Sequence, residues 1–468
     1  MKFKHYLSSL ILFICFQVCA DFLLGQQFEQ KLTEQLKEYN LNFGSMMRYR
    51  GMEFYAEDPT MDNLIRVLEE FDTKTGILFY HFKNDTLFTW LINKGGTKEL
   101  KYGFWKGSEH RLAELETEFR ALIKSRVNGV LRGAEAENMR KQEVDARMVL
   151  DSLNEALFPK AIRKEMEKLD KLLLIPALNI STIPLYLLDP HLSGRMLIED
   201  YTISVVHGMQ HLFDMQWKNG TYRRLDKVEY DLIGYTDFSQ CDRLNDLPGV
   251  EKELHAAKDR INKVDQLLIE GLRESGIRYR PLRVSLHLNA DSIRTRIDGR
   301  TAHESKSRVL YLATHAVSNP GNPLDSNFFL TCSCDHVTER EIQSMDHSDL
   351  LLVILSACQT AQGKTMNTGT LSVGRAFLKG NAQNVVSSLW SVDDEATAQF
   401  MELFMEELTP FYLDSSVMFN GKVGFDMVFY PAYQLRQAML KFKKIDPDPN
   451  HWAAFISTGS PLKGFLLE

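Results

Sequence analysis

Apolar residues form short uninterrupted runs in the last third of the chain. The runs are RVLYLATHA (308–316), DLLLVILSAC (349–358) and NVVSSLWSVDD (384–394). Such runs, bounded by polar residues, predict strands that are buried on both faces. Between the last two runs, TGTLSVGRAFLKGN has the spacing of a helix that Gly380 and Asn381 close. Strand, helix and strand in this order predict an α/β fold: a mostly parallel sheet with right-handed crossovers and helices on both faces.

The earlier part of the chain mixes helical and strand patterns. Amphipathic pieces between residues 26 and 72 predict helices. GILFYHFKNDTLFTWLINK predicts a β-hairpin around a polar Lys-Asn-Asp turn. A charged tract from about Ser108 to Leu169 predicts long helices, and KLLLIPALNISTIPLYLLD predicts a buried strand, a loop and a second apolar piece. EKELHAAKDRINKVDQLLIEGLRES predicts one more helix.

These patterns divide the chain into four parts. We expect a signal peptide at 1–20, a helical segment at 21–69, and two halves of one α/β domain at 70–200 and 201–468. No linker rich in Pro, Gly or Ser separates the two halves, so the boundary near residue 200 rests on pattern alone.

The first residues have the pattern of a secretory signal. Lys2 and Lys4 precede an apolar run from Leu7 to Val18, and Val18-Cys19-Ala20 then forms a small-residue cleavage pattern before Asp21. The run is shorter than the ~20 residues that span a bilayer, so a membrane anchor is the alternative. We therefore expect an exported protein, periplasmic or extracellular.

Composition excludes several classes of protein. The chain has 468 residues, 44% hydrophobic and 25% charged, with a net charge of -7. This is typical of a globular protein with a sizeable core, and it gives no electrostatic reason to bind nucleic acid or an anionic membrane. Loss of the signal would leave four of the six cysteines, too few for a disulfide scaffold in a chain of this length.

Chemically capable residues follow each of the three predicted strands of the last third. His315, Cys358 and the pair Asp393 and Asp394 stand at strand ends, and parallel strands bring such ends to one edge of the sheet. By itself Cys358 could be a nucleophile, a metal ligand, a disulfide half or a small buried residue. A neighbouring imidazole lowers the pKa of a thiol and later protonates the leaving amine, so the pair favours catalysis. The backbone N–H groups of Ala316 and Cys358 are candidate oxyanion donors.

Three other motifs do not predict a site. TCSCDH (331–336) offers two cysteines and a histidine but no fourth metal ligand. HGMQH (207–211) has Gly208 where a zinc protease needs glutamate, and GKT (363–365) lacks the preceding glycine of a phosphate loop. We therefore predict no metal, and a nucleotide-binding domain has no support.

The blocks LYLATHA, VTEREIQSM, LLLVILSACQTA, GTLSVGRAFLKGNAQNVVSSLWSVDDEAT and HWAAFISTGSP resemble successive blocks of the CHAT peptidase family. Members are caspase-like cysteine peptidases similar to separase. The resemblance runs from about residue 70 to the C-terminus. It implies a caspase-like fold in which a degenerate, pseudo-peptidase half with a β-hairpin and long helices (70–200) precedes a catalytic half (201–468).

The resemblance also implies an activity. The resemblance implies that the protein is a cysteine endopeptidase, with His315 as general base and acid and Cys358 as nucleophile. Such an enzyme needs no metal or organic cofactor. An acidic residue after the LW strand would bind a basic P1 side chain (the residue before the cleaved bond), which points to Asp394 first and Asp393 second. From the residues alone, either aspartate could instead cap a helix. The expected partners are a protein substrate and an activating protein.

This chain departs from the family pattern at two places. The family usually has Gly after the histidine and Glu-Thr-Gly after the cysteine, whereas this chain has Ala316 and Gln359-Thr360-Ala361. Ala316 would be strained if the turn needed a positive φ. The departures motivate the alternative function, a binding or scaffolding module that kept the fold and lost turnover.

Overall fold

The structure is a computed structural model of the chain. It describes residues 26–42, 60–69, 71, 74–96, 99–125, 136–206, 208–209, 212, 223–224, 228–239, 244–274, 282–289, 297–298, 307–317, 327–329, 336–357, 360–408, 412–419, 422–459 and 462–467. The predicted signal peptide (1–20), Cys358 and Gln359 lie outside the described residues.

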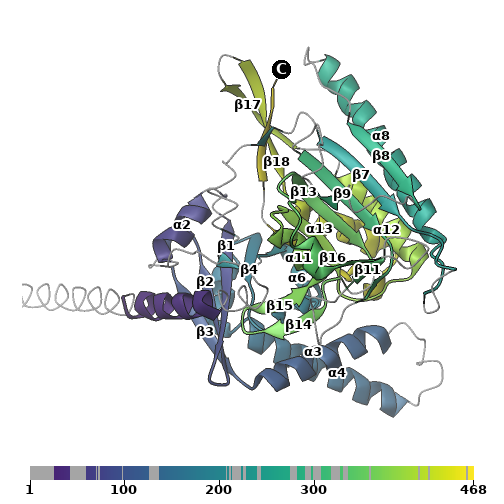
Figure 1. The fold of residues 1–468 in the computed structure, drawn as a ribbon. Helices are drawn as coiled ribbons and strands as arrows, with labels where there is room; N and C mark the ends of the chain where they lie inside the picture. The colour runs from purple at the N-terminus through teal and green to yellow at the C-terminus, as the bar shows by residue number, and fades with distance from the viewer. Residues whose placement is uncertain are drawn as a thin grey trace, which may run out of the picture.

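One large sheet forms the centre of the molecule (Figure 1). Its strands, in chain order, are β1 (Thr75–Lys83), β2 (Thr86–Ile92), β3 (Lys101–Lys106), β4 (Lys171–Ile175), β5 (Thr202–Val205), β7 (Val228–Gly234), β8 (Arg283–Leu288), β9 (Ser307–Ala313), β13 (Leu350–Ser356), β16 (Asn384–Ser388) and β19 (Phe455–Gly459). Their order across the sheet is β3-β2-β1-β4-β5-β19-β16-β13-β9-β7-β8.

Two sets of parallel strands meet in this sheet. β1, β4, β5 and β19 run parallel to one another, and so do β16, β13, β9, β7 and β8. β19 pairs antiparallel with β16, so the two sets run in opposite directions and this pair is the seam between them. β2 and β3 add an antiparallel edge. The sheet is mostly parallel, as predicted.

Helices cover the sheet. Besides the helical residues 26–42, they are α2 (Met61–Glu69), α3 (Glu109–Ser125), α4 (Ala136–Leu157), α5 (Lys160–Met166), α6 (Leu197–Asp200), α8 (Gly249–Glu274), α10 (Glu339–Ile342), α11 (Val373–Lys379), α12 (Asp394–Leu408), α13 (Pro431–Ile445) and α14 (Pro449–Trp452). No described helix has the length and apolarity needed to cross a membrane.

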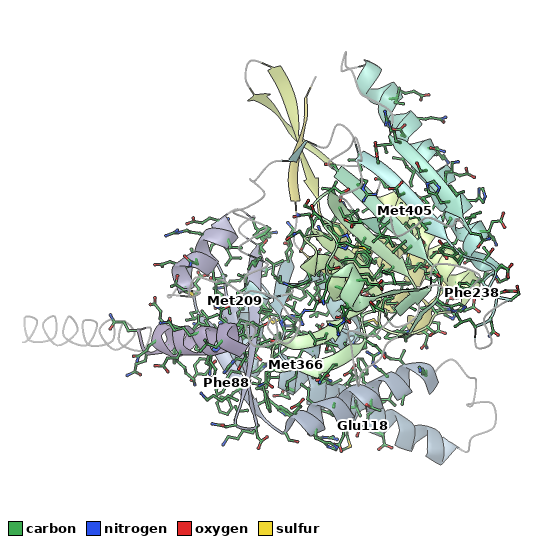
Figure 2. The ribbon with its side chains drawn as sticks, in the orientation of Figure 1. Phe88, Glu118, Met209, Phe238, Met366 and Met405 are labelled. Carbon is green, nitrogen blue, oxygen red and sulfur yellow. The ribbon has the colours of Figure 1, made fainter. Side chains whose placement is uncertain are left out.

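The helices lie on both faces. On one face, α3, α5, α8, α12 and α13 bury a continuous core that includes Met405, labelled in Figure 2. On the other face, residues 26–42 and α2 cover the first set of strands, while α10 and α11 cover the second. α8 and α12 lie side by side (Figure 1), where Arg260 pairs with Glu402 and Glu406. The predicted α/β fold with helices on both faces is confirmed.

β9 and β13 of the second set are almost continuous apolar runs because both their faces are covered. In β9, Tyr311 packs into the core on one face, and Leu310 and Leu312 into the core on the other. Arg308 is the buried exception, and its guanidinium pairs with Asp231 and Asp349. Burying this charge requires both partners, since an unpaired buried charge is costly.

Among the described residues, three smaller sheets accompany the large one. They contain β10 (Ala316–Val317), β11 (Asn327–Phe329) and β12 (His336–Thr338); β14 (Gly363–Met366) and β15 (Gly369–Ser372); and β17 (Tyr412–Phe419), β18 (Lys422–Phe429), β20 (Leu462–Leu467) and β6 (Arg223–Arg224). β17 and β18 extend away from the large sheet at the top of Figure 1.

Two predicted elements show how local sequence sets their bounds. The hairpin β1–β2 turns at Asn84 and Asp85, both with φ +50°, the conformation of the tight turn that suits twisted strands. The predicted helix in TGTLSVGRAFLKGN is shorter than expected. Ser372 caps α11 by accepting from the Arg375 N–H, so the helix begins at Val373 and the preceding residues form β15.

Candidate active site

His315 stands two residues beyond the end of β9, and two contacts fix its ring. Its Nε2 lies 2.7 Å from the carbonyl oxygen of Asn245. Its ring meets that of Phe238, labelled in Figure 2, edge to face at 4.6 Å. A carbonyl oxygen only accepts hydrogen bonds, so Nε2 carries the hydrogen. In the neutral imidazole, Nδ1 is then the nitrogen that can accept a proton.

The loop that supplies the Asn245 carbonyl is itself braced. It follows β7, the strand beside β9. The Leu247 N–H donates to the Thr236 carbonyl at 2.8 Å, and the Phe238 N–H donates to the Asp246 carboxylate at 2.7 Å. These bonds tie the two sides of the loop together and hold the carbonyl that orients His315.

A cavity of about 50 Å³ opens at the carboxyl ends of β9, β13 and β16. Its walls include Trp390 and other apolar side chains, and its polar lining is Glu253, Thr314, His315, Ser356, Ser388, Asp394 and Thr397. Ala357, the last described residue before Cys358, also lines it. The cavity thus brings together His315, Asp394 and the end of the strand that leads to Cys358.

Ser388 of β16 holds the chain on both sides of the undescribed pair Cys358–Gln359. Its hydroxyl donates to the Ala357 carbonyl, and its N–H donates to the Thr360 hydroxyl at 2.9 Å. The Ala361 N–H donates to the Ser388 carbonyl, also at 2.9 Å. Thr360, which matches the usual family residue, and Ala361, which stands where the family usually has Gly, therefore attach the chain after the cysteine to the neighbouring strand.

Ala316 lies in β10 and pairs with Phe328 of β11. It is not among the described residues with positive φ. The strain expected if alanine replaced a left-handed glycine is therefore absent at this position.

The two aspartates after β16 have different surroundings. One Asp393 carboxylate oxygen accepts from the N–H groups of Glu395 and Ala396, at 3.0 and 3.2 Å, which caps α12. Asp394 lines the cavity, and its side chain accepts no hydrogen bond from a described residue. The capping role is thus realised by Asp393, while Asp394 shares the cavity with His315.

Glu253 of α8 is a residue of the cavity that the sequence interpretation missed. It is buried, and the Tyr311 hydroxyl donates to its carboxylate. Burial raises its pKa to about 7; hydrogen bonds from Ser356 and Tyr311 oppose the rise, and the charge of Asp394 adds to it. A signal was present, because Glu253 shares the buried stripe of α8 with Val250 and Leu254. An acidic residue in such a stripe is unusual.

The remaining motifs give no further site. Cys332 and Cys334 of TCSCDH, and His207 and His211 of HGMQH, lie outside the residues whose side chains the structure describes. Among the described residues, no group of three His, Cys, Asp or Glu side chains is arranged to hold a metal ion.

Solved structures resemble this chain only distantly. The Saccharomyces cerevisiae separase-securin complex matches with a TM-score of 0.46 and 10% identity, over 85% of this chain and 31% of that chain. The complex of Porphyromonas gingivalis RgpB pro- and mature domains matches with a TM-score of 0.39 and 10% identity, over 68% of this chain and 70% of that chain. Because these TM-scores are low, no property of either protein is carried over to this chain.

Sequence comparison gives a family. Mouse (Mus musculus) tetratricopeptide repeat protein 28 is 29% identical over 136 residues, which are 28% of this chain and only 5% of that relative. The CHAT domain model matches residues 147–460, well over half of the chain, and includes every strand that lines the cavity. The chain therefore belongs to the CHAT domain family.

Proposed function

We propose that this protein is a cysteine endopeptidase that cleaves protein substrates after Arg or Lys with a dyad of His315 and Cys358. The observation that carries the proposal is the hydrogen bond from His315 Nε2 to the Asn245 carbonyl at 2.7 Å. It leaves Nδ1 as the proton acceptor, on a ring that lines the same cavity as the end of β13. Membership of the CHAT family supports a peptidase-like fold.

The reaction follows ordinary thiol chemistry. The Cys358 thiol gives its proton to Nδ1 of His315, and the thiolate attacks the substrate carbonyl carbon. The backbone N–H groups of Ala316 and Cys358 stabilise the oxyanion. Nδ1–H then protonates the leaving amine as the C–N bond breaks, which leaves a thioester. Water, deprotonated by the same nitrogen, hydrolyses the thioester and restores the thiol.

The preference for a basic P1 residue is assigned to Asp394, with Asp393 as the second candidate. Asp394 lines the cavity together with Glu253, and none of the described lining residues is Lys or Arg. Such a lining attracts a cation and repels an anion. Asp393 is the weaker candidate because its carboxylate already accepts two helix N–H groups.

The alternative function is a binding module that kept the fold and lost turnover. It is favoured by the Gln359-Thr360-Ala361 sequence after the cysteine. The proposed peptidase is exported, with protein substrates as partners. An activating protein is a further proposed partner, since the mouse relative is by name a tetratricopeptide repeat protein.

The test compares the wild type with Cys358→Ala and His315→Ala. The purified mature chains are incubated with fluorogenic peptides ending in Arg, Lys or an uncharged residue, and with a thiol-reactive peptidyl probe. We expect cleavage and labelling by the wild type, and a loss of at least about 10³-fold in both variants. Equal signal from the wild type and Cys358→Ala would eliminate the peptidase and leave the binding module.

A further inference from the structure

The cavity beside His315 holds two carboxyl groups from two different helices. Glu253 comes from the first turns of α8 and Asp394 from the start of α12. The two helices approach closely here, because a Cβ on Gly249 would lie only 3.1 Å from the Cβ of Asp394. Glycine at the start of α8 thus permits the approach that gives both acids access to one cavity.

The Glu253 carboxyl is held without a counter-charge. Its described partners are the hydroxyl groups of Tyr311 and Ser356. No described Lys or Arg pairs with it, and the side chain is almost fully buried. Burial together with the Asp394 charge raises the pKa of Glu253 to about 7, so the neutral acid predominates below neutral pH.

We propose that Glu253 is a second acidic group that selects a basic P1 side chain, and that this cationic side chain and a proton compete for it. The inference rests on the proposed function, in which the cavity receives the P1 side chain. When the cation enters, the Glu253 O–H bond breaks, the proton leaves to solvent, and the carboxylate pairs with the cation. An uncharged side chain leaves the proton in place.

Several titratable or charged groups face Glu253, and any test must separate their effects from the effect of Glu253. They are the Tyr311 phenol from β9, the Asp394 carboxylate from α12 and the His315 imidazole beyond β9. In the proposed mechanism, His315 takes part in the cleavage of every substrate. A ratio between a charged and an uncharged P1 residue therefore cancels its contribution.

The experiment measures kcat/KM for two peptides that differ only in P1, Arg or its uncharged isostere citrulline, from about pH 6 to about pH 8.5. The variants are Glu253→Gln and the matched control Glu251→Gln, an exposed residue on the same helix. In the wild type and the control, the Arg-to-citrulline ratio should rise as the pH passes about 7. In Glu253→Gln the ratio should be roughly 10- to 100-fold lower at high pH, the worth of one charge-assisted hydrogen bond, and independent of pH. An unchanged ratio and pH profile in this variant would overturn the inference.

A second measurement needs no turnover. Calorimetry of benzamidine, an arginine side-chain mimic, binding to the full-length wild type and to Glu253→Gln is repeated in buffers of different ionisation enthalpy. At about pH 6.5 we expect release of about one proton by the wild type and of none by Glu253→Gln. Equal proton release by the two proteins, or no binding to the wild type, contradicts the inference. Proton-linked binding in a chain that cleaves nothing would instead refute the proposed peptidase, and Arg-specific cleavage unaffected by Glu253→Gln would refute only the role of Glu253.

Discussion

At the scale of single residues, two neighbouring aspartates divide two tasks. Asp393 uses its carboxylate to cap α12, whereas the adjacent Asp394 faces the cavity. The sequence alone could not assign these tasks, because either residue could cap the helix or bind a substrate. The difference depends on the residue at which α12 begins.

Because the two aspartates have different roles, their substitution should affect different properties of the protein. Asp393→Ala should lower the free energy of unfolding by about 1 kcal/mol, the usual cost of a lost N-cap, and keep the preference for basic P1 residues. Asp394→Asn should change stability little and reduce that preference about tenfold or more. Urea denaturation and a panel of P1 substrates measure the two effects. A change of selectivity in Asp393→Ala at unchanged stability would reverse the assignment.

Glu253 also predicts how stability depends on pH. Its pKa is raised in the folded chain to about 7, above the ordinary value of 4.5. Its contribution to stability is thus fully present below pH 4.5 and is lost as the pH rises through about 7. Glu253→Gln removes this loss, so the variant should gain on the order of 3 kcal/mol relative to the wild type between about pH 5 and pH 8. Denaturant unfolding across this pH range, with Glu251→Gln as control, measures the gain in stability. Parallel curves of stability against pH for Glu253→Gln and the wild type would contradict the prediction.

At the scale of elements, the hairpin β14–β15 connects the chain after Cys358 to the first part of the molecule. Tyr39, in the helical residues 26–42, donates its hydroxyl to the Pro176 carbonyl at 3.0 Å and approaches the Thr368 carbonyl at 3.4 Å. Gly369, with φ +104°, lets the hairpin turn against Pro176. The position of the hairpin therefore depends on residues far away in the sequence.

Removal of this hydroxyl should loosen the hairpin. We expect Tyr39→Phe to lose about 1 kcal/mol of stability and to accelerate amide hydrogen exchange at 363–372 more than in the large sheet. Tyr102→Phe is the matched control, because its ring packs against the same core while no hydrogen bond of its hydroxyl to a described residue is seen. Equal exchange in the two variants would exclude Tyr39 as the support of the hairpin.

The sequence predicted elements where local pattern decides them and missed features that depend on tertiary packing. The runs that became β9, β13 and β16 were recognisable because burial on both faces leaves few polar positions. The place of Glu253 in the cavity was not recognisable from the sequence, because periodicity shows which face of α8 is buried but not which cavity that face borders. Whether Cys358 meets His315 stays a prediction, since Cys358 lies outside the described residues.

At the scale of the whole molecule, β19 joins two sets of strands that run in opposite directions. It pairs with β5 on one side and β16 on the other. The sequence patterns indicate directions only for strands joined by one helix or one tight turn. Several elements separate β16 from β19 along the chain, so the antiparallel seam could not be predicted. The arrangement implies that the two sets unfold together.

A proline in β19 tests this coupling. Ser457 is buried opposite Val386, and Ser457→Pro removes an N–H from the middle of the sheet. We expect a loss of about 3 kcal/mol or more, in one cooperative transition. Ser457→Ala keeps the N–H and should be close to neutral, because the Ser457 hydroxyl has no partner among the described residues. Two separate transitions in Ser457→Pro would show that the two sets are independent.

The position of β19 also bears on when the site is completed during synthesis. Phe455, its first residue, lines the cavity beside His315, yet β19 is made after every other strand of the large sheet. A growing chain can pair β9, β13 and β16 but lacks one wall of the cavity until β19 has left the ribosome. For the proposed peptidase, this order of synthesis predicts that nascent chains lack a finished substrate pocket and do not cleave substrate.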